Sequence, residues 1–165
     1  MATITFKGTP AKTIGKNLEL GQKAPNFNLI AADLSEKTLH DFAGKTLILN
    51  IFPSLDTGVC ALSVKQLNDL AKKNSSIHVL HISKDLPFAQ KRFCQTEAIE
   101  NSVTLSAFRS DFDKNYGLGL ADTPLKGLLT RCVIIINPDQ SIHNIQWVPE
   151  ITTEPNYAAI EAALG

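Results

Sequence analysis

The sequence lacks a net charge, a long apolar run and an even number of cysteines. Sixteen Lys and Arg residues balance sixteen Asp and Glu residues in a chain of 165. This balance argues against nucleic acid or an anionic membrane as the main partner, because both usually attract a clustered basic surface. No apolar run approaches the roughly 20 residues of a membrane-spanning helix. The three cysteines fit a reducing compartment better than a secreted disulfide scaffold.

Internal repeats, low-complexity segments and a signal-peptide core are also missing. Residues 1–15 alternate apolar and polar side chains, so we expect structure there, and we expect the protein to be cytoplasmic. Apolar residues make up 44% and charged residues 19% of the chain, which is typical of folded globular proteins and excludes a disordered chain. The length predicts a single domain over residues 1–165.

The order of apolar patterns predicts an α/β fold. A short N-terminal β-hairpin is expected over residues 3–16, with its turn near Gly8. The predicted strands cover residues 27–31, 37–39, 46–52, 77–83, 103–108, 131–137 and 142–148, and the predicted helices cover 59–73, 87–99, 112–116 and 156–164. The central β-α-β-α-β alternation, followed by an antiparallel pair, predicts a mixed central sheet flanked by helices on both faces. A thioredoxin-like fold is one economical arrangement of these elements.

The segment "FPSLDTGVC" (52–60) follows the predicted strand 46–52. Pro53 ends the strand because it has no N–H for the ladder, and Thr57 or Asp56 is suited to cap the next helix. Cys60 then lies in the first helical turn, where free N–H groups and the helix dipole favour a thiolate. Most free cysteines are buried and inert, which is the alternative. The strand-to-helix junction favours a nucleophile.

Arg131 opens an almost purely apolar predicted strand, where a charge needs a reason. The alternative is a solvated surface arginine. Because side chains alternate across a strand, Cys132 must face the opposite side from Arg131. If Arg131 faces Cys60, we interpret Cys132 as a small buried hydrophobic residue.

Cys94 lies about two turns into the predicted helix 87–99. Pro87 suits the first turn of this helix, and Asp85 is a possible cap. By pattern alone, Cys94 could also be a thiol of the helical core.

Four segments carry a resemblance to a known family. "PSLDTGVC" matches the Pro-x-x-x-Thr-x-x-Cys motif of the peroxiredoxins. The stretches "SKDLPFAQKRFC", "PLKGLLTRCVIII" and "EITTEPNY" resemble the bacterial thiol peroxidase branch, the atypical two-cysteine type. The resemblance spans nearly the whole chain. It implies a thiol-dependent peroxidase that reduces hydrogen peroxide and alkyl hydroperoxides in antioxidant defence.

The resemblance also implies a role for each matched residue. Cys60 would be the peroxidatic cysteine, and Cys94 the resolving cysteine that forms an intramolecular disulfide with it. Thr57 would hydrogen-bond the thiolate and the peroxide, and Pro53 would shield the thiolate. Arg131 would hold the thiolate and polarise the peroxide. A disulfide needs Cα atoms within about 7 Å, so we expect both helix starts to unwind locally before the two cysteines meet.

The same resemblance implies thioredoxin as reductant, a homodimer, and no metal, flavin or haem cofactor. Stabilising the thiolate is worth little by itself, because a more acidic thiol is also a weaker nucleophile. The larger effect must act on the peroxide's leaving oxygen, through donors such as Thr57 and Arg131. Phe52, Leu55 and Leu128 are apolar neighbours that could favour alkyl hydroperoxides.

Two rival functions would use the same fold or the same chemistry. A thiol-disulfide oxidoreductase is disfavoured because the chain has no Cys-x-x-Cys. A peroxide-sensing redox relay protein would use the same sulfenic acid and stays open. A metal site is not indicated, because His78 and His81 lie three residues apart on a predicted strand and face opposite sides. His40 and His143 are interpreted as surface residues.

Overall fold

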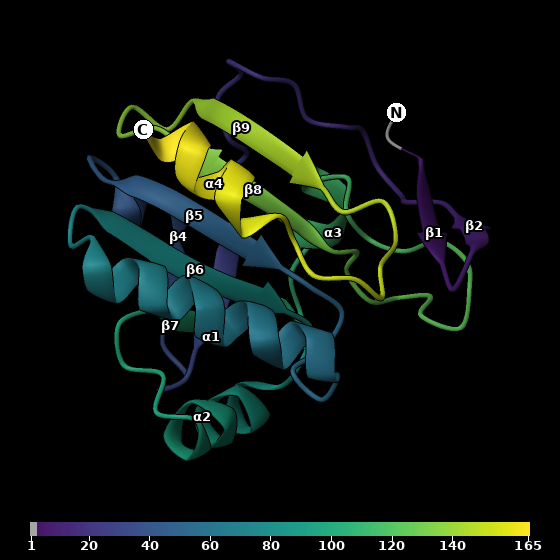
Figure 1. The fold of residues 1–165 in the computed structure, drawn as a ribbon, viewed down its shortest axis with the longest axis horizontal. Coiled ribbons are helices and arrows are strands. Elements are labelled where there is room, and N and C mark those ends of the chain that lie inside the picture. Colours follow the sequence, from purple (N-terminus) through teal and green to yellow (C-terminus); the bar gives the residue numbers. More distant parts are fainter. Residues whose placement is uncertain (1–2) are drawn as a thin grey trace.

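The computed structural model describes residues 3–165 and has a seven-stranded mixed sheet at its centre (Figure 1). The strands are β3 (Asn28–Ala31), β4 (Glu36–Thr38), β5 (Thr46–Ile51), β6 (Ile77–Ser83), β7 (Val103–Ser106), β8 (Cys132–Ile136) and β9 (Ile142–Trp147). Their spatial order is β4-β3-β7-β6-β5-β8-β9. The central strands β5, β6 and β7 run parallel, and the outer pairs are antiparallel.

Helices cover both faces of this sheet. They are η1 (Leu39–Phe42), α1 (Gly58–Lys73), α2 (Pro87–Thr96), α3 (Phe112–Asn115) and α4 (Tyr157–Leu164). In Figure 1, α1 and α4 lie in front of the sheet and α3 lies behind it. A separate hairpin, β1 (Ile4–Phe6) and β2 (Thr9–Ala11), lies near the N-terminus. The predicted α/β fold, mixed sheet and N-terminal hairpin are therefore confirmed.

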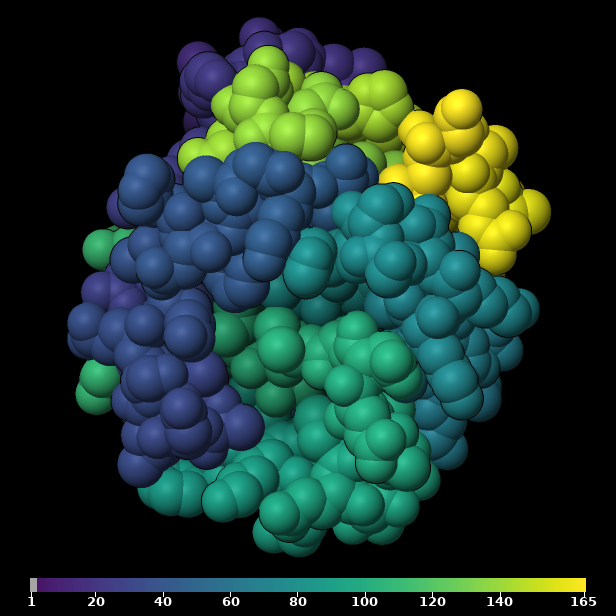
Figure 2. Space-filling view, turned by 90° about the vertical axis from the view of Figure 1, so that its left-hand side faces the viewer, coloured from purple at the N-terminus to yellow at the C-terminus, as the bar shows by residue number. Residues whose placement is uncertain are grey.

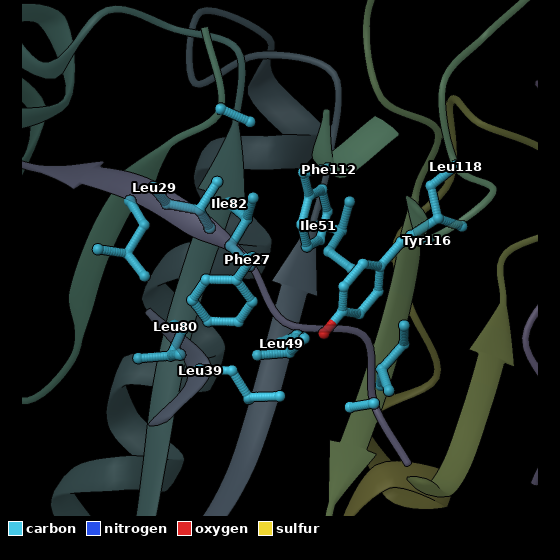
Figure 3. Close-up of a cluster of buried hydrophobic side chains, with 14 of the residues drawn as sticks. Phe27, Leu29, Leu39, Leu49, Ile51, Leu80, Ile82, Phe112, Tyr116 and Leu118 are labelled. Carbon is cyan, nitrogen blue, oxygen red and sulfur yellow. The ribbon is translucent and has the colours of Figure 1, made fainter. Parts of the chain in front are cut away.

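The two faces of the sheet bury different residues, as strand alternation requires. Ile48, Val133 and Ile135 pack with residues of α1 and α4. Their strand neighbours face the opposite cluster, which contains Leu49 and Ile51 together with Phe27, Phe112 and Tyr116 (Figure 3). Arg131 has the same parity as Val133, and Cys132 belongs to the opposite cluster. The predicted parity of residues 131 and 132 is confirmed.

The predicted helix 87–99 ends three residues early, at Thr96. Ala98 adopts a left-handed conformation (φ 54°), and the N–H of Ile99 bonds to the carbonyl of Cys94. These features form a Schellman-type helix end built on alanine instead of the usual glycine. The apolar Ile99 can then return to the core beside Cys60. No glycine marks this helix end in the sequence, where Ala98 takes its place.

Candidate active site

Thr57 caps α1 and thereby orders the first helical turn around Cys60. Its backbone is extended (φ −104°, ψ 143°), and its Oγ1 accepts a hydrogen bond from the Cys60 N–H at 3.4 Å. The same hydroxyl donates to the carbonyl of Ser54 at 3.1 Å. The prediction of Thr57 as one of two candidate caps is confirmed, and Asp56 is not the cap. The Thr57 hydroxyl donates its single proton to the Ser54 carbonyl. It therefore makes no hydrogen bond to Cys60 Sγ in the described part of the chain.

Cys60 is fully buried and is bonded to Arg131. The Arg131 guanidinium donates from Nη2 to Cys60 Sγ at 3.1 Å, across 71 residues of sequence. Phe52 and Val64 pack around the thiol in the same apolar cluster. A cationic donor at this distance favours negative charge on the sulfur. The geometry therefore suits a nucleophilic thiolate shielded from bulk water.

Arg131 is only 2% exposed. Each of its three guanidinium nitrogens has a different hydrogen-bonding environment. Nε donates to the carbonyl of Ile151 at 2.9 Å, which fixes the plane of the guanidinium. Nη2 holds the Cys60 sulfur. Nη1 is buried and has no hydrogen-bond partner within the part of the chain that the structure describes. An unpaired buried charged donor is costly, so this nitrogen is available to a ligand.

A cavity of about 280 Å³ borders Arg131, which hydrogen-bonds the sulfur of Cys60, and Thr57, which accepts its backbone N–H. Its lining comes from the hairpin, the Cys60 loop, the start of α1 and the later loops: Phe6, Lys7, Pro53, Thr57, Gly58, Val59, Leu125, Arg131, Ile151 and Thr152. The expected apolar neighbours Phe52, Leu55 and Leu128 do not line it. Phe52 is fully buried beneath the loop, and Leu55 points to a smaller cavity beside α2. Pro53, unlike these three residues, does line the 280 Å³ cavity beside Arg131.

Cys94 and Cys132 have different environments. Cys94 is half-buried on α2, where its Sγ lies 3.9 Å from Thr104 Oγ1 and packs against the cluster that contains Cys60. Burial raises the pKa of the Cys94 thiol, with a smaller opposing effect from Thr104. Cys132 is fully buried on the other face of the sheet, and burial strongly raises the pKa of its thiol. All three cysteines are free thiols.

Glu150 is a structural residue of the site that we did not identify from the sequence. Its carboxylate accepts hydrogen bonds from Thr5 Oγ1 at 2.8 Å, Gly8 N–H at 2.9 Å and Thr152 Oγ1 at 2.6 Å. These bonds attach the N-terminal hairpin to the turn that presents the Ile151 carbonyl to Arg131. The hydrogen bond from the Thr152 hydroxyl is the largest of the effects that hold the pKa of Glu150 well below its ordinary value. A carboxylate followed two residues later by threonine in "EITTEPNY" was the available signal.

Glu150→Gln should remove the contribution of this carboxylate to the pH dependence of the melting temperature. A carboxyl group whose pKa is lowered by folding stabilises the fold above its ordinary pKa, here 4.5, and loses this contribution as the pH falls through the lowered value. The melting temperature of wild type should therefore exceed that of Glu150→Gln most at neutral pH, and the gap should shrink below about pH 4.5. Glu161→Gln, on the exposed surface of α4, controls for the loss of one negative charge. A gap that stayed constant down to pH 3 would contradict this role.

The histidines are dispersed. His81 is fully buried, and burial lowers its pKa to about 3, so it is neutral at pH 7. Its ring nitrogens contact Asn50 and Ser102 at 3.0 and 2.8 Å. His78 borders a hollow of about 200 Å³ at the opposite end of the sheet from Cys60, an end that Figure 2 shows. No group of three or more His, Cys, Asp or Glu residues suited to a metal occurs within residues 3–165.

None of the helices in the described part of the chain combines the length and the apolar character that crossing a membrane requires.

The family model described as Redoxin matches residues 19–160 of this chain. A thiol peroxidase of Mycobacterium tuberculosis strain H37Rv is 47% identical over 165 residues, which cover 100% of this chain and 99% of the relative. A thiol peroxidase of Corynebacterium glutamicum is 48% identical over 164 residues, with 99% of each chain covered. Among solved structures, a peroxiredoxin-like protein from Aquifex aeolicus has a TM-score of 0.93 at 37% identity, covering 99% of this chain and 96% of that one. With matches of this extent along the whole sequence, the chain belongs to the redoxin family.

Proposed function

We propose that this thiol-dependent peroxidase reduces hydroperoxides with Cys60 as its nucleophile. The observation that carries the proposal is the arrangement of Arg131, a residue that lines the cavity. It holds Cys60 Sγ at 3.1 Å through Nη2, and its Nη1 is buried and unpaired within the described residues. A peroxide that enters the cavity supplies the missing acceptor. The same side chain then orients both the nucleophile and the bond that breaks.

In the first step, the Cys60 thiolate attacks the terminal oxygen of the hydroperoxide. An S–O bond forms, the O–O bond breaks, and the departing alkoxide takes a proton from solvent to give the alcohol. Cys60 becomes a sulfenic acid. Negative charge develops on the departing oxygen, so a preorganised donor such as Arg131 Nη1 can lower the barrier by about 2–4 kcal/mol.

Thr57 would orient the substrate mainly as an acceptor. Its hydroxyl proton is given to Ser54, and one lone pair receives the Cys60 N–H. A second lone pair on the same oxygen can accept the O–H of the peroxide. Pro53 lines the cavity next to it and contributes no N–H that would compete for the substrate.

In the second step, Cys94 would resolve the sulfenic acid. Its sulfur attacks Cys60 Sγ, an S–S bond forms and the S–O bond breaks, and the departing hydroxide leaves as water with the proton of the Cys94 thiol. An external dithiol, thioredoxin on the family resemblance, then reduces the disulfide. The two cysteines belong to separate helices that pack on one apolar cluster, and we expect the ends of these helices to open before the bond forms. A homodimer and a cytoplasmic location are part of the same proposal.

Cysteine variants test the proposal in a thioredoxin-coupled assay. Cys94→Ser should lose continuous turnover but still consume one peroxide equivalent per chain, because only Cys60 performs the first step. Cys132→Ala should turn over like wild type, since Cys132 is buried on the other face of the sheet. Full thioredoxin-dependent turnover by Cys94→Ser would contradict the resolving role. Slow turnover by wild type, with mixed disulfides to other proteins, would favour the redox relay.

A further inference from the structure

Asp85 lies at the same end of the central strands as the Cys60 loop. The loop 52–57 follows β5, and Asp85 follows β6, the parallel neighbour of β5 (Figure 1). Adjacent parallel strands deliver their following loops side by side. The segment that contains Asp85 leads directly into α2, which carries Cys94. Asp85 therefore lies between the loop that precedes Cys60 and the helix that carries Cys94.

The carboxylate of Asp85 binds the Cys60 loop through both oxygens. Oδ1 accepts a hydrogen bond from Ser54 Oγ at 2.7 Å, and Oδ2 accepts the backbone N–H of Leu55 at 2.8 Å. Ser54 in turn accepts the Thr57 hydroxyl through its carbonyl, and Thr57 caps the Cys60 N–H. A continuous series of hydrogen bonds therefore runs from Asp85 to Cys60.

Asp85 is also fixed on the side of α2. Ser83 Oγ donates to Asp85 Oδ2 at 2.7 Å, and the fully buried Gln90 of α2 donates to the same Ser83 oxygen at 3.2 Å. Asp85 is therefore not the cap that the sequence indicated for α2. The cap position is Leu86, which makes no side-chain capping bond. The prediction was wrong because the donors of the neighbouring loop take the carboxylate instead.

We propose that Asp85 is a positioning residue that holds the segments around Cys60 and Cys94 in their reduced arrangement and so sets the balance between peroxide attack and disulfide formation. This inference rests on the proposed function. Peroxide attack needs the loop closed, because Thr57 and Arg131 must be in place around Cys60. Disulfide formation needs the loop and the start of α2 to separate from their reduced positions. The same carboxylate therefore promotes the first step and opposes the second.

Asp85→Asn should change the two rates in opposite directions. Asparagine keeps one acceptor oxygen and replaces the other with an NH₂ group, which is a donor only. The side chain can therefore no longer accept hydrogen bonds from both Ser54 Oγ and the Leu55 N–H. We expect oxidation of Cys60 to slow by about tenfold, the effect of losing one hydrogen bond to a charged group. Disulfide formation from the sulfenic acid should accelerate by up to about tenfold, because less of the closed arrangement must be disrupted.

The two steps are measured separately by rapid mixing with a hydroperoxide, acid quench and mass spectrometry. Oxidation of Cys60 is followed in the Cys94→Ser background, and disulfide formation is followed with Cys94 present. Hydrogen exchange should be faster in both 52–60 and 84–94 of Asp85→Asn. Asp56→Asn is the matched control, since Asp56 lies in the same loop with its side chain exposed and only its backbone N–H bonded to Ser54. Ser54→Ala removes a single bond to Asp85 and should give a smaller change of the same sign.

Opposite changes in the two rates, absent from Asp56→Asn, are the expected result. A general loss of structure would instead slow both steps, and that result would overturn the inference. So would rates in Asp85→Asn equal to those of Asp56→Asn. If wild type itself formed no Cys60–Cys94 disulfide, the proposed function would fail and this inference with it.

Discussion

Arg131→Lys should lower kcat/KM for hydroperoxides by about 10²–10³-fold. Arg131 uses Nε for the Ile151 carbonyl and Nη2 for Cys60 Sγ, and it keeps Nη1 for the substrate. These nitrogens point in fixed directions that a single ammonium group cannot reproduce. A lysine that reached Cys60 would carry all three of its N–H donors on one nitrogen. It would therefore leave the Ile151 carbonyl without its donor and would hold no N–H at the position of Nη1. The charge would be kept, so the loss measures geometry more than electrostatics.

Initial rates at low peroxide concentration check this prediction. Arg109→Lys is the matched control, because Arg109 is 60% exposed in its side chain and pairs with Glu36 at 3.7 Å, away from the cavity. Melting temperatures of both variants separate a loss of activity from a loss of fold. If Arg131→Lys were as fast as wild type, donation from Nη1 to the peroxide would not contribute to catalysis.

Cys60→Ser should reduce peroxide consumption to the uncatalysed background. A serine hydroxyl is a weak nucleophile unless a general base activates it, and the groups around Cys60 are a guanidinium, an N-capping hydroxyl and apolar side chains. The fold should persist, since serine is smaller and Arg131 can donate to its oxygen. Cys132→Ala should retain wild-type activity, because its sulfur lies in the cluster on the opposite face. Activity retained by Cys60→Ser and lost by Cys132→Ala would assign the chemistry to the wrong cysteine.

Local rules predicted the part of the site that depends on periodicity and on backbone chemistry. Strand alternation alone places the side chains of Arg131 and Cys132 on opposite faces of the sheet, because the period of two is strict inside a sheet. The Thr57 cap followed from the orphan N–H groups of a helix start. Neighbouring parallel strands and the covering helices likewise followed from the order of apolar runs.

Contacts between distant loops could not be predicted in this way. Asp85 was interpreted as a cap of its own helix, but it binds Ser54 and Leu55, which lie about 30 residues earlier. Glu150 binds the hairpin more than 140 residues away. Each of these carboxylates had local donors available, and only the packing of the loops decided which donors it bound. The lining of the cavity was missed for the same reason.

The cavity lining also changes the expectation about substrate. Its apolar lining includes Phe6 of the hairpin and Leu125 as well as Pro53 and Val59 of the cysteine motif, and Lys7 also borders it. Phe52, which the sequence suggested as a neighbour of the substrate, instead packs with Cys60 in a buried apolar cluster. We therefore expect peroxide preference to depend on the hairpin and the loop around Leu125 as well as on the cysteine motif.

The roles of Cys60 as nucleophile and of Cys94 as resolving thiol are tested most directly by the mass of each cysteine-containing peptide after one equivalent of hydroperoxide. In Cys94→Ser, we expect the gain of one oxygen on the Cys60 peptide alone. In wild type, we expect the loss of two hydrogens and a peptide pair linked through Cys60 and Cys94, with Cys132 unmodified. Oxygen that appeared first on Cys94 or Cys132, or a disulfide that included Cys132, would contradict the account.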